Sequence, residues 1–348
     1  MSNLDISRWA LFARKDDSGF GRMSMMMKTA LGVQRHIAIP SDRLEDIDVI
    51  PPFETWLSPK APIEEVLQQL EGLQGIFFFE HMNWHPQMLE AAQKLGVKTV
   101  CIPMWEWFSG DRPEWKHVDL IACPSEWTLK VVQSFGLANA SFLDWPVDVN
   151  QLPDRVVTGP AKHFFHNAGL VDAQDRKGTA DSINAFRRVK NPDLRLTVRM
   201  QKEAKMPRTD NRIEIQVGNI PDYAELYKQG DVAIQPSKME GIGFMVLEPY
   251  CCGIPTITTD YPPMNEFITD PRLLVKPRWG KRKAFPTAWI PHAHLRIPQT
   301  GDLAQKIRWC AENDLSEISR GNRQHALEKY DRQRIQNEWF EALDRLLQ

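Results

Sequence analysis

The chain has 348 residues, of which 42% are hydrophobic and 25% charged, and 43 Lys and Arg against 45 Asp and Glu give a net charge of −2. These proportions fit a globular protein long enough for two cores, and they exclude a disordered chain or a coiled coil. The near-neutral net charge also excludes a general electrostatic affinity for nucleic acid or anionic membrane, but it does not exclude a local basic patch. Evidence for function must therefore come from individual sites.

The cysteines and the hydropathy of the sequence indicate the cellular location of the protein. The five cysteines form no C-x-x-C pair, which favours reduced thiols, and the adjacent Cys251 and Cys252 are expected to be packed in a buried helix. No stretch approaches the roughly 18 apolar residues that span a bilayer, and residues 1–17 contain no apolar signal region. We expect a cytoplasmic protein without a transmembrane segment.

The N-terminal half alternates short apolar runs with amphipathic stretches. Predicted strands cover residues 9–13, 36–39, 76–79, 98–102 and 120–123, and predicted helices cover 22–31, 62–73, 86–95 and 126–135. Continuous apolar strands separated by helices indicate a parallel sheet that is covered on both faces. Residues 1–150 are therefore predicted to form a Rossmann-like α/β domain.

The alternation stops in a proline-rich linker at residues 145–160 and then begins again. Predicted strands cover residues 163–166, 195–198, 213–217, 232–235 and 256–258, with helices at 179–189, 223–229 and 244–252. We expect a second Rossmann-like domain over residues 151–315, with the site in the cleft between the domains. Residues 316–348 are expected to form one long helix that returns to the N-terminal domain.

The most informative segment, residues 236–255, contains two glutamates eight positions apart. A strand that ends near residue 235 runs into a glycine turn and an apolar helix, so the turn lies at the carboxyl end of a parallel strand, where ligands bind. If the helix begins near Gly241, Glu248 lies about two turns beyond Glu240. Gly241 and Gly243 allow a ligand close to the backbone, and the first helical amides suit a phosphate. A solvated carboxylate pair beside a core helix is the alternative.

The pattern Glu-x7-Glu, with E-G-I-G-F inside it and L-E-P-x-x-x-G-x-P at its end, resembles the signature of the retaining glycosyltransferases of family 4, which have the GT-B fold. The resemblance extends over most of the chain and is strongest at residues 163–268. It implies that Glu240 lies against the donor sugar and that Glu248 holds the nucleotide ribose. The turn residues Gly241, Ile242, Gly243 and Phe244 would then belong to the donor site.

Residues 165–178 resemble the same family's strand, glycine turn and K-G helix start. The resemblance implies that Lys177 meets the donor diphosphate and offsets the negative charge of the leaving group. The family usually has an arginine five residues before this lysine, where this chain has Asp172, so Arg176 is the candidate replacement. An Arg-Lys pair that is simply solvated at a helix start is the alternative.

Three further groups of candidates lie in the N-terminal half. The resemblance implies that Gly19 and Gly21 close over the donor phosphate, although a glycine turn before a helix is common for conformational reasons alone. It also implies that His81, chosen over His85, lies against the donor sugar, with a structural histidine as the alternative. Aromatic side chains at a cleft edge stack on sugars, so the acceptor-side candidates are Trp105, Glu106 and Trp107; a lid packed on the core would have the same sequence.

The resulting hypothesis is an enzyme, a hexosyl or pentosyl transferase, that moves a sugar from a UDP- or GDP-sugar donor to a glycan or lipid-linked glycan with retention of anomeric configuration. Glu240, His81 and Lys177 are the candidate catalytic residues, and neither a metal nor another cofactor is expected. One alternative is a GT-B module that binds sugar or nucleotide without catalysis. Another is transfer to a modified DNA base, suggested by basic and aromatic residues interleaved at 276–285.

Overall fold

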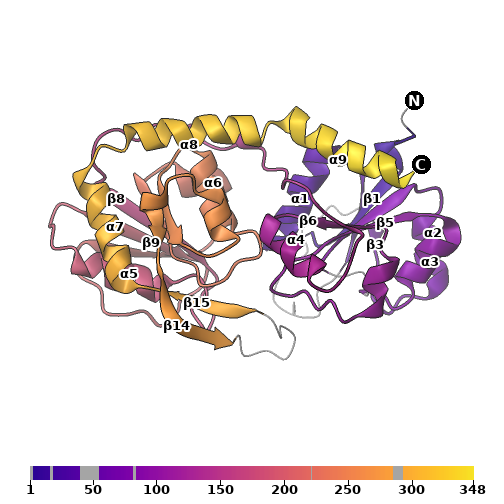
Figure 1. The fold of residues 1–348 in the computed structure, drawn as a ribbon, viewed down its shortest axis with the longest axis horizontal. Helices are drawn as coiled ribbons and strands as arrows, with labels where there is room; N and C mark the ends of the chain where they lie inside the picture. The colour runs from indigo at the N-terminus through magenta and orange to yellow at the C-terminus, as the bar shows by residue number, and fades with distance from the viewer. Residues whose placement is uncertain (1–2, 16–18, 40–54, 81–83, 221, 285–292) are drawn as a thin grey trace. The chain divides into compact units, whose positions relative to one another are not determined.

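The computed structural model describes residues 3–15, 19–39, 55–80, 84–220, 222–284 and 293–348. Contacts between Cα atoms divide the chain into two compact units. Unit 1 comprises Met1–Asp148 and Arg332–Gln348, and unit 2 comprises Val149–Asp331. Figure 1 shows that each unit has helices packed around a sheet of its own.

Unit 1 is built on a seven-stranded parallel sheet in the order β3-β2-β1-β4-β5-β6-β7. Its strands are β1 (Trp9–Ala13), β2 (Arg35–Ala38), β3 (Thr55–Trp56), β4 (Gly75–Phe79), β5 (Lys98–Ile102), β6 (Leu120–Cys123) and β7 (Ala140–Phe142). Its helices are η1 (Ile6–Arg8), α1 (Gly19–Leu31), α2 (Ile63–Leu70), α3 (Met88–Leu95), η2 (Pro113–His117), α4 (Glu126–Gln133) and α9 (Arg332–Leu346).

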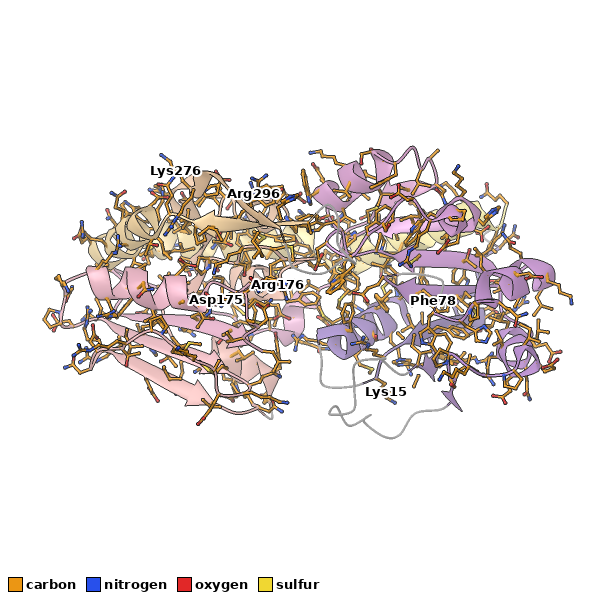
Figure 2. All side chains as sticks on the ribbon, turned by 90° about the horizontal axis from the view of Figure 1, so that it is seen from below. Lys15, Phe78, Asp175, Arg176, Lys276 and Arg296 are labelled. Carbon is orange, nitrogen blue, oxygen red and sulfur yellow. The ribbon has the colours of Figure 1, made fainter. Side chains whose placement is uncertain are left out.

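The core of unit 1 follows from the apolar strands. Every residue of β1 is buried, as expected for a strand with helices on both faces. Phe12 of β1 lies opposite Phe78 of β4, which is labelled in Figure 2, and their rings stack with centroids 5.1 Å apart. The chain runs outward from β1 to β3 and then returns to the other side of β1 at β4, which is the doubly wound topology.

Unit 2 has a six-stranded parallel sheet in the order β10-β9-β8-β11-β12-β13 and an antiparallel hairpin, β14-β15. The strands are β8 (His163–Gly169), β9 (Arg195–Met200), β10 (Ile213–Val217), β11 (Val232–Gln235), β12 (Thr256–Thr259), β13 (Leu274–Val275), β14 (Pro277–Ala284) and β15 (His294–Pro298). The helices are η3 (Val149–Gln151), α5 (Thr179–Arg188), η4 (Tyr223–Tyr227), α6 (Phe244–Cys251), η5 (Met264–Phe267), η6 (Pro271–Leu273), α7 (Thr300–Glu312) and α8 (Ser316–Lys329). Here the direction of winding reverses between β8 and β11, so the loops after these two strands are neighbours.

The expected single helix over residues 316–348 is wrong, because the structure has two helices, α8 and α9. The Tyr330 N–H closes α8 by donating to the Ala326 carbonyl, and Asp331, a residue type favoured at helix starts, precedes α9. The break has a packing reason. Helix α8 packs on α6 in unit 2, whereas α9 packs on α1 in unit 1, where the Trp339 indole N–H donates to the Asp144 carbonyl at 3.0 Å.

The cysteines and helices add two observations. All five cysteines are buried free thiols, and burial raises the pKa of Cys252 to about 12, so this thiol stays protonated at neutral pH. Among the helices within the described ranges, none combines the length and the apolar character that a membrane span requires.

Candidate functional site

The candidate site lies in unit 2, where β8 and β11 end. The loop after β8 contains Asp172, Arg176 and Lys177, and the loop after β11, residues 236–243, contains Glu240. Because β8 and β11 are adjacent parallel strands, their carboxyl ends bring the two loops together. The Lys238 N–H donates to the Arg176 carbonyl at 2.7 Å, which joins the loops through their backbones.

A glycine at position 178 permits this close approach. Gly178 has φ +72°, and a Cβ atom there would lie 2.4 Å from the Pro236 carbonyl oxygen. Asp175, just before Arg176, also has a positive φ of 49°. Its carboxylate compensates by accepting from the N–H groups of Thr179 and Ala180 at 2.7 and 3.1 Å, which caps the start of α5.

A second glycine sets the start of α6. Gly243 has φ +88° and forms the N-cap, so the helix begins at Phe244, as predicted for residues 244–252, and not near Gly241, the start on which the two-turn spacing of the glutamates depended. The residues between Glu240 and Gly243 are a non-helical turn, and Glu248 therefore lies one turn, not two, into the helix. A Cβ atom at position 243 would approach the Glu240 side chain to 3.3 Å, so this turn packs tightly on the glutamate.

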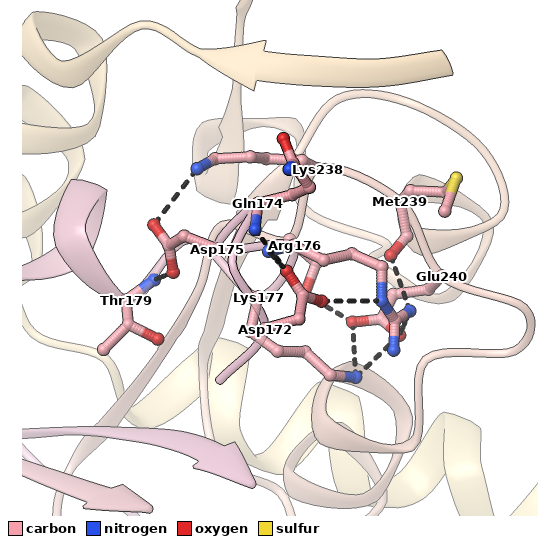
Figure 3. Close-up of polar contacts among 10 residues, drawn as sticks. Asp172, Gln174, Asp175, Arg176, Lys177, Thr179, Lys238, Met239 and Glu240 are labelled. Atoms are coloured by element: carbon pink, nitrogen blue, oxygen red, sulfur yellow. Dashed lines mark hydrogen bonds and ion pairs between the residues drawn. The ribbon is translucent and has the colours of Figure 1, made fainter. Parts of the chain in front are cut away.

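Glu240 is the centre of the polar cluster in Figure 3. The Lys177 Nζ lies 2.8 Å from each carboxylate oxygen, and the Arg176 Nη1 lies 3.0 Å from Oε2. The Ser237 hydroxyl donates to Oε1 at 2.6 Å. The structure thus brings together Glu240, Arg176 and Lys177, the three residues that the sequence proposed for the sugar and the diphosphate.

Charge balance fixes the protonation state of Glu240. Burial alone would raise the pKa of Glu240, but Lys177 and Arg176, together with hydrogen bonds from Lys177 and Ser237, outweigh it and lower the pKa below its usual value. Glu240 is therefore ionised at neutral pH. Its side chain is only 4% exposed, whereas those of Arg176 and Lys177 are 25% and 17% exposed, so the two cations keep surface that an anion can contact.

The expected position of the family's arginine is occupied by Asp172, which holds the loop. Its carboxylate accepts from the backbone N–H groups of Gln174 and Arg176 at 2.9 and 3.2 Å, and it lies 3.7 Å from the Arg176 Nε. The Arg176 Nη1 also donates to the Met239 carbonyl at 3.0 Å. Asp172 therefore orients the arginine that takes part in the cluster.

Lys238 joins the same two loops through its side chain. Its Nζ lies 3.1 Å from Asp175 Oδ2 and 3.1 Å from Asp181 Oδ2, and the lysine is buried. The Lys238 carbonyl also accepts from the Arg296 N–H of β15 at 2.9 Å. Burial raises the pKa of Asp181, and Lys238 opposes this increase. Lys238 thus forms a buried ion triad between the loop of Glu240 and the start of α5.

Glu248 is held separately from Glu240. The Tyr223 and Tyr227 hydroxyls donate to the same carboxylate oxygen, Oε2, at 2.8 and 2.5 Å. Burial and then the charge of Glu248 raise the pKa of Tyr227 well above its usual value, so this phenol stays protonated and acts as a donor. Glu248 has no exposed surface.

The sequence candidates in unit 1 are placed as follows. Gly19 opens α1 and Gly21 is buried in its first turn, whereas His81 lies outside the described residues. Trp105 and Glu106 follow β5 and are buried, and Trp107 is partly exposed. The Trp105 ring packs edge to face on Trp127 at 5.8 Å, which for Trp105 favours packing on the core over stacking on a sugar.

Several residues of the site were missed by sequence reasoning. Ser237 follows directly after the strand and the proline that begin the motif, which is a signal that could have identified it. The four-residue spacing of Tyr223 and Tyr227 indicates one helical face, but it does not identify Glu248 as their partner. Asp175, Asp181 and Lys238 carry no local pattern. Within the parts of the chain that the structure describes, no three His, Cys, Asp or Glu side chains gather to hold a metal ion.

Comparisons with known proteins give one match in sequence and several in fold. Residues 172–284 match the sequence model of the glycosyl transferases group 1 family. HepE from Anabaena, in complex with UDP and glucose, is 13% identical with a TM-score of 0.70, over 96% of this chain and 99% of HepE. A glycosyltransferase from Rickettsia africae ESF-5 is 12% identical with a TM-score of 0.66, over 98% of each chain. No curated protein matches the sequence.

A third solved structure has a fold similar to that of this chain. The α,α-trehalose-phosphate synthase (UDP-forming) from Burkholderia xenovorans, in complex with glucose-6-phosphate, is 10% identical with a TM-score of 0.61, over 96% of this chain and 99% of the synthase. These likenesses confirm the expected α/β architecture of two Rossmann-like domains. The chain therefore has the GT-B fold, and its residues 172–284 are similar to the group 1 glycosyltransferases.

Proposed function

We propose that the protein is a glycosyltransferase that takes a sugar from a nucleotide-diphosphate sugar and transfers it with retention of anomeric configuration. The observation that carries the proposal is the cluster of Glu240, Arg176 and Lys177 between the end of β8 and the start of α6. The match to the group 1 family over residues 172–284, which include all three side chains, supports it.

The two cations suit the diphosphate of the donor. As the bond from sugar to phosphate breaks, negative charge grows on the leaving phosphate, and fixed cations stabilise that charge. The exposed surface of Arg176 and Lys177 is available to the phosphate oxygens, and an arginine fork and a lysine point charge are both established ways to bind them. This pair is our proposed substitute for the arginine that Asp172 replaces.

Glu240 is proposed to position the donor sugar and to stabilise positive charge at its anomeric carbon. Its lowered pKa excludes a role as a general acid at neutral pH, because that role needs a protonated carboxyl. The diphosphate would draw Arg176 and Lys177 toward itself, and the carboxylate oxygens would then accept from sugar hydroxyls. Retention by this route uses the leaving phosphate oxygen as the base toward the acceptor, so it needs no protein nucleophile.

The remaining roles are proposed by analogy with the family. Glu248 would accept from the ribose hydroxyls, and Gly241, Ile242, Gly243 and Phe244 would line the donor site. Gly19, Gly21 and His81 are proposed on the donor phosphate and sugar, with Trp105, Glu106 and Trp107 on the acceptor side. HepE in complex with UDP-glucose, and the UDP-forming synthase, make UDP the first nucleotide to test and GDP the second.

The test is a panel of UDP- and GDP-sugars, with binding measured by thermal shift and turnover by release of nucleoside diphosphate. A transferase releases nucleoside diphosphate faster when a suitable glycan or lipid-linked glycan is added. NMR of the product of a retaining transferase should show the same anomeric configuration as in the donor. Binding without release for every donor and acceptor pair would replace the proposal with a non-catalytic binding module.

Transfer to a modified DNA base is a second candidate that one observation favours. Exposed Lys276 directly precedes β14 of the hairpin, exposed Arg278 is the second residue of that strand, and residues 271–301 contain no acidic residue. A cationic ribbon binds phosphates, and such binding weakens steeply as salt increases. Absence of DNA binding at low salt would eliminate this candidate without affecting the donor proposal.

A further inference from the structure

The carboxylate of Glu248 is inaccessible in this structure. The residue has no exposed surface, and two phenol hydroxyls donate to its Oε2 at 2.8 and 2.5 Å. Two donors fill the two lone-pair positions of one carboxylate oxygen. A ligand hydroxyl can therefore reach this oxygen only if one of the phenols leaves it.

The two phenols differ in how firmly they are held. Tyr227 is completely buried and makes the shorter hydrogen bond to Glu248. Tyr223 is only partly buried and opens the five-residue helix η4, whose N-cap is the exposed Asp222. The rings meet edge to face at 5.9 Å, so Tyr223 lies against Tyr227 and is not enclosed by it. Tyr223 is thus the phenol that can leave.

A reason for two phenols follows from the cost of a buried charge. An ionised carboxylate without donors is strongly disfavoured in the interior, so Glu248 needs hydrogen bonds when no ligand is present. Tyr227 supplies one donor permanently, and Tyr223 supplies the second. A ribose hydroxyl is chemically equivalent to the second donor, since both are O–H groups that give one hydrogen bond.

We propose that Tyr223 is a specificity-determining residue whose hydroxyl occupies the position on Glu248 that a ribose hydroxyl of the donor takes on binding. This inference rests on the proposed function, because it assumes that the ligand is a nucleotide. Exchange of one O–H donor for another adds little affinity for a ribonucleotide. A nucleotide without ribose hydroxyls that displaces Tyr223 on binding would leave the buried carboxylate one donor short, so the exchange acts strongly against it.

Calorimetric binding of UDP and GDP, and of their 2′,3′-dideoxy forms, to the full chain tests the proposal. The wild-type protein is expected to prefer the ribose forms. In Tyr223→Phe no hydroxyl at position 223 has to be displaced from Glu248, so the variant is expected to bind the ribonucleotide about tenfold more tightly than the wild type does. Tyr227→Phe is the matched control, because it removes a donor from the same oxygen but does not open the site, and it should give no such gain.

A second measurement does not depend on the variants' affinities. The chain has five tyrosines, so labelling with 3-fluorotyrosine gives a simple ¹⁹F NMR spectrum in which Tyr223 is assigned by its absence from Tyr223→Phe. Its signal should shift when the ribonucleotide is added and shift less with the dideoxy form.

The outcomes separate the two levels of the argument. Equal or weaker ribonucleotide binding by Tyr223→Phe, with normal binding by the wild type, would overturn the exchange and leave the proposed function standing. Failure of the wild-type protein to bind either nucleotide would overturn the proposed function and this inference together.

Discussion

The ion triad at Lys238 gives a prediction that can be worked out from the structure. Lys238→Met keeps the length of the side chain but removes its charge, which leaves Asp175 and Asp181 without their shared cation. The lysine is 9% exposed and the two aspartates 20% and 15% exposed, so the pairing is largely shielded from water. Removing one member of a buried ion pair costs about 3 to 5 kcal/mol, and the remaining exposure of the aspartates reduces the expected loss to about 2 to 4 kcal/mol.

The same substitution is expected to slow turnover. Lys238 is two residues from Glu240, and Asp175 directly precedes Arg176, so the triad fixes the distance between the proposed sugar and diphosphate contacts. A displacement of about 1 Å at a reacting centre can cost about 100-fold in rate. We expect kcat to fall by about that factor and KM for the donor to change less, since the binding groups remain. Lys238→Arg, which restores the charge, should recover most of the loss in both assays.

Urea unfolding and steady-state kinetics measure the two effects, and a double-mutant cycle identifies their source. Asp181→Asn should cost less stability in the Lys238→Met background than in the wild type, with a coupling of about 1 to 3 kcal/mol. Wild-type stability and turnover in Lys238→Met would refute the reasoning. So would additive costs in the cycle, because independent residues show no coupling.

Two further predictions concern the same loops. Gly178→Ala places a Cβ 2.4 Å from the Pro236 carbonyl oxygen at φ +72°, so it should lower the free energy of unfolding in urea by more than about 2 kcal/mol and impair donor binding. The control is Gly159→Ala, which has a similar φ of +71° but open space around the added Cβ, and it should lower that free energy by only about 1 kcal/mol. Burial lowers the pKa of His166 to about 4, although its Nδ1 hydrogen bond to the Ile234 carbonyl opposes the change. The unfolded chain then binds a proton that the folded one does not, so stability should fall by about 3 kcal/mol as the pH drops from about 6.5 to 4. His166→Asn should flatten that part of the pH profile, and an unchanged profile would contradict the assignment.

The fold was predictable because parallel strands that are covered by helices on both faces appear in the sequence as continuous apolar runs. The expected strand at residues 232–235 and the expected start of α5 at residue 179 are both found in the structure. The tail was predicted incorrectly for a physical reason. Helical periodicity continues through residue 330, but the apolar positions before and after it pack on different units, and a single sequence pattern does not record which surface each half will meet.

The site was predictable to the extent that its residues lie in one motif. Glu240 lies in a turn after a strand whose position the sequence indicates, and Lys177 lies two residues before the predicted start of α5. Contacts between distant segments were not predictable. The pairing of Lys238 with Asp175 joins residues 63 positions apart, and that of Tyr227 with Glu248 joins residues 21 apart. The first pairing follows from the order of strands in the sheet, which brings the loops after β8 and β11 together, whereas the second joins η4, which precedes β11, to α6, which follows it.

The most direct test of the central claim is the turnover of Glu240→Gln. The substitution keeps the shape of the side chain and removes the charge that Arg176 and Lys177 now neutralise. Release of nucleoside diphosphate from the donor identified in the UDP- and GDP-sugar panel would be measured with acceptor present. The surface variant Glu203→Gln, in the same unit, serves as the control for the loss of a carboxylate.

We predict that Glu240→Gln loses a factor of about 100 or more in kcat, as expected for the loss of a contact that stabilises charge in the transition state, while Glu203→Gln keeps wild-type turnover. The folded state of Glu240→Gln, followed by circular dichroism, should be retained. Full turnover by Glu240→Gln would contradict the account, because no other carboxylate has been assigned to the sugar.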